Sequence, residues 1–438
     1  MVDFAILAIV AITIVSGFIA AERGIQLAKA KIAAVALANE KMEVIRNMPY
    51  DELSTAHGNI YPPGEILDAE QVGRKNMDFS VQTTIRYVDD PYDGNFNGTI
   101  EGKPQDIYPY DYKKAEIKVY KVGRSDPLAV LTTNISAKAA ETPTNTGILY
   151  LCVIDSENKP VEGALATVQN ITTDPPVDMQ FTTDSTGCVM VPALPPELHN
   201  QYHVFVTKDG FSLDMTYPRT SQNPNELQPD INIFAQQVTN LTLAIDKVST
   251  IRLHAVDLAG APVPGLTIHV EDSKQIYFNP ITYKYSQDHE TDGDGNLILE
   301  KMEWGDYKFS ILTDGKYLSA TSPMQPVHLY PNTEIDITIL VTDSTGAPRI
   351  SNFTPVRGVG SDITTITITG DNFDNLPIVK LRNSVGEILG TNIAVHSGKT
   401  IEADFNLALG SPGIYEIYIE NSGGEFAVQP NAFEIVAP

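Results

Sequence analysis

Two cysteines, Cys152 and Cys188, supply the whole sulfur chemistry of this 438-residue chain. Each lies in a segment whose apolar pattern predicts a strand. If the two strands are neighbours, a disulfide across the intervening loop would lower the conformational entropy of the unfolded chain and so stabilise the fold by about 3–4 kcal/mol. That bond would also place the protein in an oxidising compartment, whereas the alternative is a pair of buried free thiols. No Cys-x-x-Cys spacing is present, which disfavours zinc binding and thioredoxin-like chemistry.

A polar loop gathers hard oxygen ligands of the type that calcium prefers. The candidate ligands are Asp89, Asp90, Asp93, Asn95 and Asn97. Their spacing is not that of an EF-hand and the distant bidentate glutamate is missing. Because Asp-Gly and Asn-Gly pairs are also ordinary turn formers, a plain loop is the competing interpretation.

Residues 292–296, with the sequence DGDGN, also begin like a calcium loop. Their place in an internal repeat described below predicts a hairpin turn instead. The eight histidines are scattered, and no phosphate-binding glycine loop, nucleophile elbow or metalloprotease helix occurs. The sequence therefore predicts neither catalysis nor a required cofactor.

Five Asn-x-Ser/Thr sequons make N-glycosylation a candidate modification if the source organism glycosylates its surface proteins. The acceptor positions are Asn97, Asn134, Asn170, Asn240 and Asn352.

The formal net charge is −25, and residues 1–50 contribute five basic and four acidic groups, so the remainder carries about −26. A surface this acidic repels nucleic acid and anionic lipid headgroups, which makes both poor candidate partners. The 30 glycines and 29 prolines, together with many Thr, Val and Ile residues, indicate short strands joined by turns. The length predicts several domains rather than one core.

A long N-terminal helix is expected to precede these β domains. Residues 4–20 are seventeen uncharged, mostly apolar residues, which as a helix would span roughly 26 Å, close to a hydrocarbon core. Charges then appear, and the helical pattern continues to Met48, before Pro49 ends it. Ile25, Ala28, Ile32, Val35, Asn39 and Met42 recur at three- and four-residue steps, which predicts a packing seam. The side chains expected to pack between helices are Phe4, Ile6, Leu7, Ile9, Val10, Ile12, Ile14, Val15, Phe18, Ile19, Ile25, Ile32 and Val35.

A cleaved secretory signal is disfavoured, because no basic segment precedes the apolar run. A simple membrane anchor conflicts with charge bias: Arg23, Lys29 and Lys31 would keep the bulk of the chain in the cytoplasm, although its β-rich part looks extracellular.

The stretches MVDFAILAIVAITIVSGFIAAE and ALANEKMEVIRNMPYDEL resemble a type IV pilin that has lost its basic leader. The resemblance implies that a prepilin peptidase exposes Met1 and that the helix waits in the inner or cytoplasmic membrane. Assembly machinery would then pack it into a filament core. Bacterial type IV pilins usually carry glutamate at the fifth mature position, where this chain has Ala5. Either Asp3 pairs with the terminal amine of Met1 in a neighbouring copy, or the assembly resembles the archaeal and divergent kinds that lack this acid.

The resemblance also implies a β head over residues 49–140, with strands expected at 79–88 and 114–121. Residues 137–147 read as a linker. Residues 147–245 and 249–342 then look like two copies of one unit, opening ILYLCVIDSENKPVEGALATV and IRLHAVDLAGAPVPGLTIHV. They resemble the carboxypeptidase regulatory-like fold, a transthyretin-type β-sandwich that implies a spacer and no peptidase activity.

Residues 347–438 contain ISNFTP, TITITGDNF and a closing YEIYIENSGG, and they resemble an IPT/TIG domain with an immunoglobulin-like fold. The predicted fold class is thus mainly β with one long helix (1–48), followed by a β head and three sandwiches.

The predicted function is that of a structural subunit of an extracellular type IV pilus-like filament. It would polymerise with itself through the helix and sit in the membrane before assembly. One alternative is a minor, tip-located pilin whose sandwiches bind carbohydrate or a host surface. The other is a membrane-tethered surface-binding protein that never polymerises.

Overall fold

A computed structural model describes residues 2–92, 94, 100–104, 106, 111–136 and 145–438, without the side chains of residues 2–13. The chain is mainly β with one long N-terminal helix, which confirms the predicted fold class. It divides into two compact units, and each is described by itself. The first comprises residues 1–153, 160–206 and 230–243; the second comprises 154–159, 207–229 and 244–438.

The helix α1 runs over Val2–Asn47 and is followed by a short 3-10 turn, Tyr50–Glu52. It ends where the sequence predicts, because Pro49 disfavours helical geometry in the residue before it. Arg46 lies in the last turn, where a cation is favourable next to the exposed carbonyl groups.

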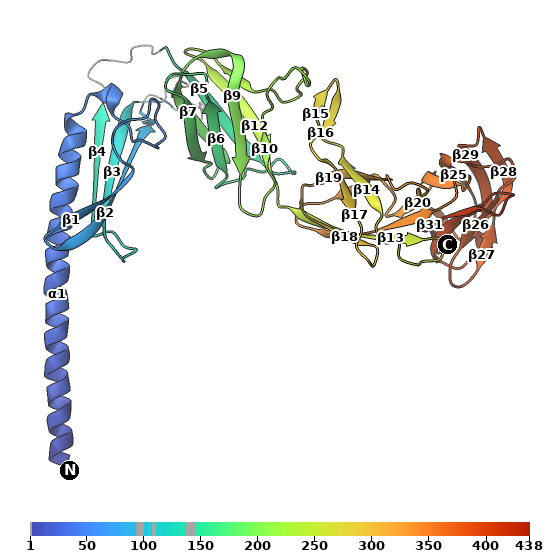
Figure 1. The fold of residues 1–438 in the computed structure, drawn as a ribbon, viewed down its shortest axis with the longest axis horizontal. Coiled ribbons are helices and arrows are strands. Elements are labelled where there is room, and N and C mark those ends of the chain that lie inside the picture. The colour runs from blue at the N-terminus through green and yellow to red at the C-terminus, as the bar shows by residue number, and fades with distance from the viewer. Residues whose placement is uncertain (1, 93, 95–99, 105, 107–110, 137–144) are drawn as a thin grey trace. The chain divides into compact units, whose positions relative to one another are not determined.

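A four-stranded antiparallel sheet forms the head, in the order β1-β2-β3-β4. Its strands are β1 (Ala69–Arg74), β2 (Met77–Val88), β3 (Tyr112–Lys121) and β4 (Ala129–Ser136). β2 and β3 contain the two strands expected at 79–88 and 114–121, and each begins two residues earlier. Along β3 buried and half-buried residues alternate, so that Ala115, Ile117 and Val119 face the core. The C-terminal half of α1 packs across β3 and β4 and covers this face (Figure 1).

The next domain pairs β12-β5-β8 in one sheet and β9-β6-β7, with β11 on β9, in another. Its strands are β5 (Gly147–Ile154), β6 (Leu165–Asn170), β7 (Val177–Thr182), β8 (Cys188–Leu194), β9 (Glu197–Thr207), β11 (Ile231–Ile233) and β12 (Val238–Ala244). The short β10 (Asp214–Met215) belongs to the second compact unit.

The following domain has two four-stranded sheets, β18-β13-β22-β20 and β17-β14-β19-β21, with a separate hairpin β15-β16. Its strands are β13 (Ser249–Asp257), β14 (Thr267–Asp272), β15 (Gln275–Phe278), β16 (Ile281–Tyr283), β17 (Ser286–Glu290), β18 (Asn296–Met302), β19 (Gly305–Ile311), β20 (Tyr317–Ser322), β21 (Val327–Leu329) and β22 (Glu334–Thr342).

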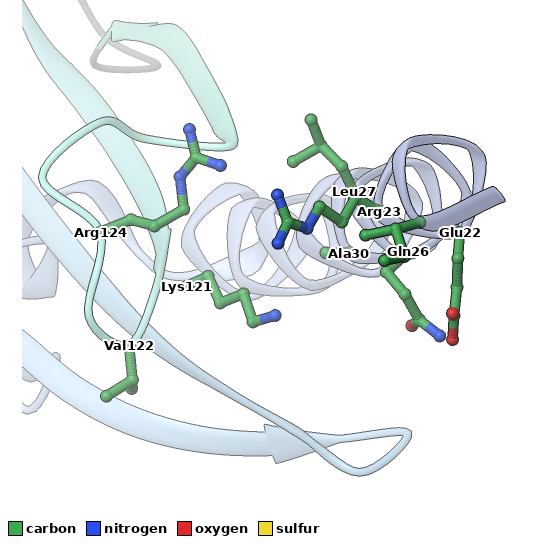
Figure 2. A pocket seen from close by; sticks show the side chains of 9 residues that line it. Glu22, Arg23, Gln26, Leu27, Ala30, Lys121, Val122 and Arg124 are labelled. Atoms are coloured by element: carbon green, nitrogen blue, oxygen red, sulfur yellow. The ribbon is translucent and has the colours of Figure 1, made fainter. Parts of the chain in front are cut away.

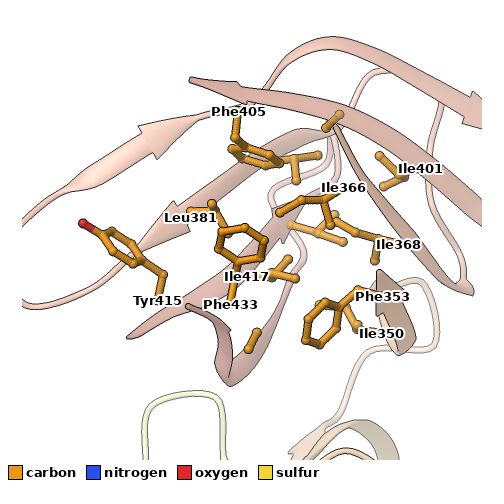
Figure 3. Close-up of a cluster of buried hydrophobic side chains, with 14 of the residues drawn as sticks. Ile350, Phe353, Ile366, Ile368, Leu381, Ile401, Phe405, Tyr415, Ile417 and Phe433 are labelled. Carbon is orange, nitrogen blue, oxygen red and sulfur yellow. The ribbon is translucent and has the colours of Figure 1, made fainter. Parts of the chain in front are cut away.

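The C-terminal domain packs the sheet β23-β25-β29-β28 against β24-β31-β30-β26-β27. Its strands are β23 (Arg349–Thr354), β24 (Arg357–Val359), β25 (Ile363–Asp371), β26 (Ile378–Arg382), β27 (Glu387–Leu389), β28 (Thr391–His396), β29 (Thr400–Asn406), β30 (Gly413–Glu420) and β31 (Phe426–Val436). Side chains from both sheets interdigitate in its core, among them Ile366 and Phe405 from one and Leu381, Ile417 and Phe433 from the other (Figure 3).

Candidate assembly surface on the N-terminal helix

The helix has one face that the head covers. Its buried residues are Ala30, Ala33, Ala34, Leu37, Ala38, Met42 and Ile45. They recur at three- and four-residue steps, and most are alanine, so the helix axis can approach the sheet closely. The predicted seam and this face share only Met42; Ile25, Ala28, Ile32, Val35 and Asn39 are exposed in the single chain.

A second apolar stripe on α1 has no partner within the described chain. Every residue from 14 to 29 is exposed, and Ala30 is the first that the head buries. Ile14, Phe18, Ile25 and Ile32 are 67%, 73%, 55% and 67% exposed. Leaving such side chains in water costs about 1.5–3 kcal/mol each relative to burial. This stripe is therefore the strongest candidate in the described structure for contact with other molecules.

Six of the thirteen residues predicted to pack between helices lie at positions whose side chains are outside the described residues: Phe4, Ile6, Leu7, Ile9, Val10 and Ile12. The suggested charge pair of Met1 and Asp3 falls outside them as well. Among the helices that the structure does describe, none has the combination of length and apolar character that crossing a membrane requires.

A hollow of about 520 Å³ lies beside residues 19–30 of α1, where the turn between β3 and β4 approaches the helix (Figure 2). Its lining residues are Ile19, Glu22, Arg23, Gln26, Leu27, Ala30, Lys121, Val122 and Arg124. Three cations and one carboxylate therefore share the lining with exposed apolar side chains. The turn that carries two of these cations is closed by the Arg124 N–H, which donates to the Lys121 carbonyl at 3.0 Å.

Lys113 connects the end of the helix to the head, and no sequence pattern pointed to it. Its ammonium donates to the carbonyl oxygens of Tyr50 and Leu53 at 2.7 and 3.0 Å. It also lies 4.6 Å from the Tyr50 ring centre. Burial lowers the pKa of Lys113 to about 8. The side chain thus satisfies carbonyls of the turn that follows α1.

The predicted disulfide is confirmed. Cys152 on β5 lies opposite Cys188 on β8, and their sulfur atoms are bonded. The equivalent register in the next domain is occupied by His254 and Asn296, which share a 2.6 Å hydrogen bond. The same place in two similar sheets is thus crosslinked covalently in one and by a hydrogen bond in the other.

Paired turns support the view that these two domains are copies. The Asp184 carboxylate accepts from the Thr186 N–H at 2.8 Å, and the Asp292 carboxylate accepts from the Asp294 N–H at 2.9 Å. Each turn ends in a glycine with positive φ, 73° at Gly187 and 75° at Gly295. A Cβ there would approach a carbonyl oxygen to 2.7 Å in both cases, so only glycine fits. The DGDGN run is accordingly a turn, but the predicted hairpin is wrong, because the flanking strands β17 and β18 pair with β14 and β13 in two different sheets.

A partly buried charge cluster lies beside β14 in the second compact unit. The Lys284 ammonium contacts Asp214 at 3.2 Å and Glu303 at 2.9 Å. The Lys274 ammonium contacts the same glutamate at 2.6 Å and lies over the Trp304 ring, 3.4 Å from the ring centre. Burial is the main cause that raises the pKa of Asp272 to about 6. Sequence reasoning missed this cluster, because its members are scattered and none belongs to a recognisable motif.

The calcium prediction is not tested by the structure. Asp93, Asn95 and Asn97 lie outside the described residues. The carboxylate of Asp90 accepts from the Tyr92 N–H at 3.1 Å, an ordinary turn contact. Over the described part of the chain, no three His, Cys, Asp or Glu side chains converge in a metal-binding group.

Four of the five predicted glycosylation positions are described. Asn134, Asn240 and Asn352 are exposed. Asn170 is only 1% exposed, and its carboxamide oxygen accepts from the Thr172 N–H at 2.9 Å. Glycosylation at Asn170 stays a prediction, and its burial would require modification before the domain folds. The sequon pattern carries no information about burial.

Residues 348–435 match the family model of the IPT/TIG domain, which confirms that assignment for the C-terminal region. No significant match to a curated protein is found. The match does not extend to the helix, the head or the two preceding sandwiches.

Solved structures with distant similarity include the minor pilin GBS52 of Streptococcus agalactiae, at 15% identity over 45% of this chain and 95% of that one, with a TM-score of 0.22. The TIE protein of Bacillus anthracis is 13% identical over 88% of this chain and 72% of its own, with a TM-score of 0.19. The shaft pilin spaA of Lactobacillus rhamnosus GG is 12% identical over 45% and 98%, with a TM-score of 0.17. TM-scores this low establish no shared fold.

Proposed function

We propose that this chain is a structural, non-enzymatic subunit of an extracellular filament, and that it polymerises with itself through α1. The observation that carries the proposal is the exposed apolar stripe of Ile14, Phe18, Ile25 and Ile32 on a helix that reaches well beyond its own head. Packing these side chains against other copies of the helix would remove them from water, at about 25 cal/mol per Å².

The helix has two distinct apolar faces, which suits this role. The alanine-rich face attaches the helix to its own head, and the larger side chains remain for neighbours. Gly17 and Gly24 have no heavy atom within 4 Å of an added Cβ, so nothing in the single chain requires glycine there. In a helical bundle, such small residues permit close approach of a second helix.

The finer assignment to a type IV pilus-like assembly rests on the sequence resemblance. In that scheme a prepilin peptidase processes the N-terminus, and the helix resides in the membrane until an assembly machine extracts it. The two repeats act as carboxypeptidase regulatory-like spacers between the head and the IPT/TIG domain. The β domains face outward, and their acidic surface keeps the filament soluble.

The test is to shear cells, purify surface filaments and determine the N-terminal residue of the subunit by mass spectrometry. Deletion of residues 4–20 should abolish filaments while the head and sandwiches remain folded. Filaments that persist after this deletion would refute the proposal. Scarce subunits confined to filament tips would instead assign the chain to the adhesive, tip-located role.

A point variant makes the test sharper. Phe18→Asp places a charge in the exposed stripe and should prevent assembly, because an unpaired carboxylate inside a helical core is costly. Phe278→Asp is the matched control, since Phe278 on β15 is also an exposed phenylalanine, at 53%. If both variants assemble equally well, the stripe is not the polymer interface.

A further inference from the structure

Five cations lie on α1 just beyond its apolar segment or at the end of β3 and the turn after it, and we call them the basic collar: Arg23, Lys29, Lys31, Lys121 and Arg124. Three belong to the helix, Lys121 is the last residue of β3, and Arg124 lies in the turn that follows it. Figure 2 shows Arg23, Lys121 and Arg124 around the same hollow, with Leu27 between the helix and the turn. Two segments about a hundred residues apart in sequence therefore bring positive charge to one level of the helix.

The collar cations have no carboxylate partner within the described residues. Two other cations at the contact of the helix with the head are paired: Lys41 contacts Glu70 at 2.5 Å, and Arg74 pairs with Glu40. None of the five collar side chains forms such an ion pair in the described structure, although the chain carries 55 acidic residues against 30 basic ones. Positive charge is thus left for an anion from outside this chain.

The position of the collar points to the kind of anion. Arg23 follows the end of the apolar run at Ala20 by three residues, about 4.5 Å along the helix axis. The hollow also exposes apolar groups, including Leu27 at 43% and Val122 at 51%. Cations next to exposed apolar side chains, directly beside an apolar helical segment, are the chemistry of a membrane interface.

We propose that the basic collar binds the phosphate groups of anionic phospholipids while α1 is held in the membrane before assembly. This inference rests on the proposed function, which places the helix in a membrane at that stage. The overall charge of −25 argues against anionic lipid as a partner. Salt, however, screens charges farther than about 8–10 Å from the phosphate, so the nearby collar decides the interaction.

The collar would orient the subunit with its head directly above the lipid surface. Its contacts are weak enough to be broken during extraction, because each cation near an anionic surface contributes only about a fivefold change in binding. An acidic surface of a second copy is the competing occupant. Adjacency to the apolar run favours lipid, because a filament contact would not require the cations to lie at that level.

The experiment uses the full chain, diluted from detergent into a mixture of phosphatidylcholine vesicles and vesicles containing about one-third phosphatidylglycerol. The two populations are separated by flotation, and the protein in each is quantified. We expect the unaltered chain to prefer the phosphatidylglycerol vesicles, and we expect added salt to weaken this preference.

The test variant is Lys121→Gln with Arg124→Gln, which leaves the helix sequence intact. Loss of two cations should reduce the preference about 25-fold. The control is Lys159→Gln with Lys316→Gln, which removes the same charge from sites outside the collar and should leave the preference unchanged. Circular dichroism checks that both variants remain folded.

An unaltered chain without preference, or a collar variant that keeps it, would overturn the proposal. A collar variant that keeps its lipid preference but fails to form filaments would assign the collar to contact between copies. The filament proposal stands or falls on sheared filaments and the Phe18→Asp variant, so the two results can be told apart.

Discussion

Reduction of the Cys152–Cys188 disulfide should destabilise its own domain and leave the similar domain next to it unaffected. The bond closes a loop with a sequence separation of 36. The chain-entropy relation for such a loop gives about 3.8 kcal/mol at 25 °C, so a loss of about 3–4 kcal/mol is expected. That is a large share of the stability of one domain, which is typically about 5–15 kcal/mol.

The measurement is hydrogen exchange with mass spectrometry on the full chain, with and without reductant, because it resolves each domain separately. Slow amides of β5 and β8 should exchange about 200- to 900-fold faster after reduction if they open by global unfolding of the domain. Amides of β13 and β18 form an internal control, since His254 and Asn296 stand where the cysteines would be. The Cys152→Ser and Cys188→Ser double variant should reproduce the effect without reductant.

Unchanged exchange in β5 and β8 after complete reduction would refute the reasoning. It would mean that pairing of β5 with β8 and β12 persists in the unfolded chain and restricts that chain as much as the disulfide does. Equal acceleration in β13 and β18 would show instead that the two domains unfold together. The reduced state must be verified by thiol labelling in the same samples.

Two further predictions concern charge, and a third concerns glycosylation. The folded pKa of Asp272 is raised from 3.8 to about 6. Its contribution to stability is therefore present at low pH and is lost as pH rises through about 6. Two pKa units correspond to about 3 kcal/mol, which solvent screening around the partly open cluster reduces to about 1–2 kcal/mol. Asp272→Asn should therefore stabilise the domain at pH 7 and remove this dependence, as measured by exchange in β14 and β19; an unchanged pH profile would contradict the pKa assignment. The folded pKa of Lys113 is lowered from 10.5 to about 8, so the unfolded chain binds more protons between these values and head stability should rise from about pH 8 to about pH 10. Lys113→Met should abolish that rise and Lys114→Met should not, with exchange in β3 as the readout. Asn170→Gln should leave any glycan mass unchanged, whereas Asn134→Gln, Asn240→Gln or Asn352→Gln should reduce it if the source cell glycosylates the chain; a glycan found on Asn170 would show modification before folding.

Local patterns were sufficient to predict the elements whose residues lie close together in sequence. The helix end at Pro49, the β2 and β3 strands and the paired Asp-to-Gly turns all follow from short-range rules. The disulfide could be predicted because the chain has only two cysteines. The burial of Asn170 could not be predicted, because it depends on tertiary packing, which a sequon does not report.

The buried charges could not be predicted for a related reason. Lys113 and Lys114 are adjacent on one strand, yet Lys113 is 2% exposed and contacts carbonyls of the turn after α1. Strand periodicity predicts that neighbouring residues face opposite sides, but it does not say which side the helix will cover. Asp272, Glu303 and Lys284 converge only when separate strands and loops pack together.

The two faces of α1 show why the predicted seam and the observed head contact differ. Heptad-like spacing identifies apolar stripes but assigns no partner to them, and this helix has two. The head covers the stripe of small residues, such as Ala30 and Ala34, because alanine lets the helix backbone lie close against a sheet. The bulkier residues Phe18, Ile25 and Ile32 remain exposed. Phe18 and Ile25 precede Ala30, the first residue that the head buries, so no rotation of the helix would bury them against the head. Their exposure therefore argues for a partner other than the head.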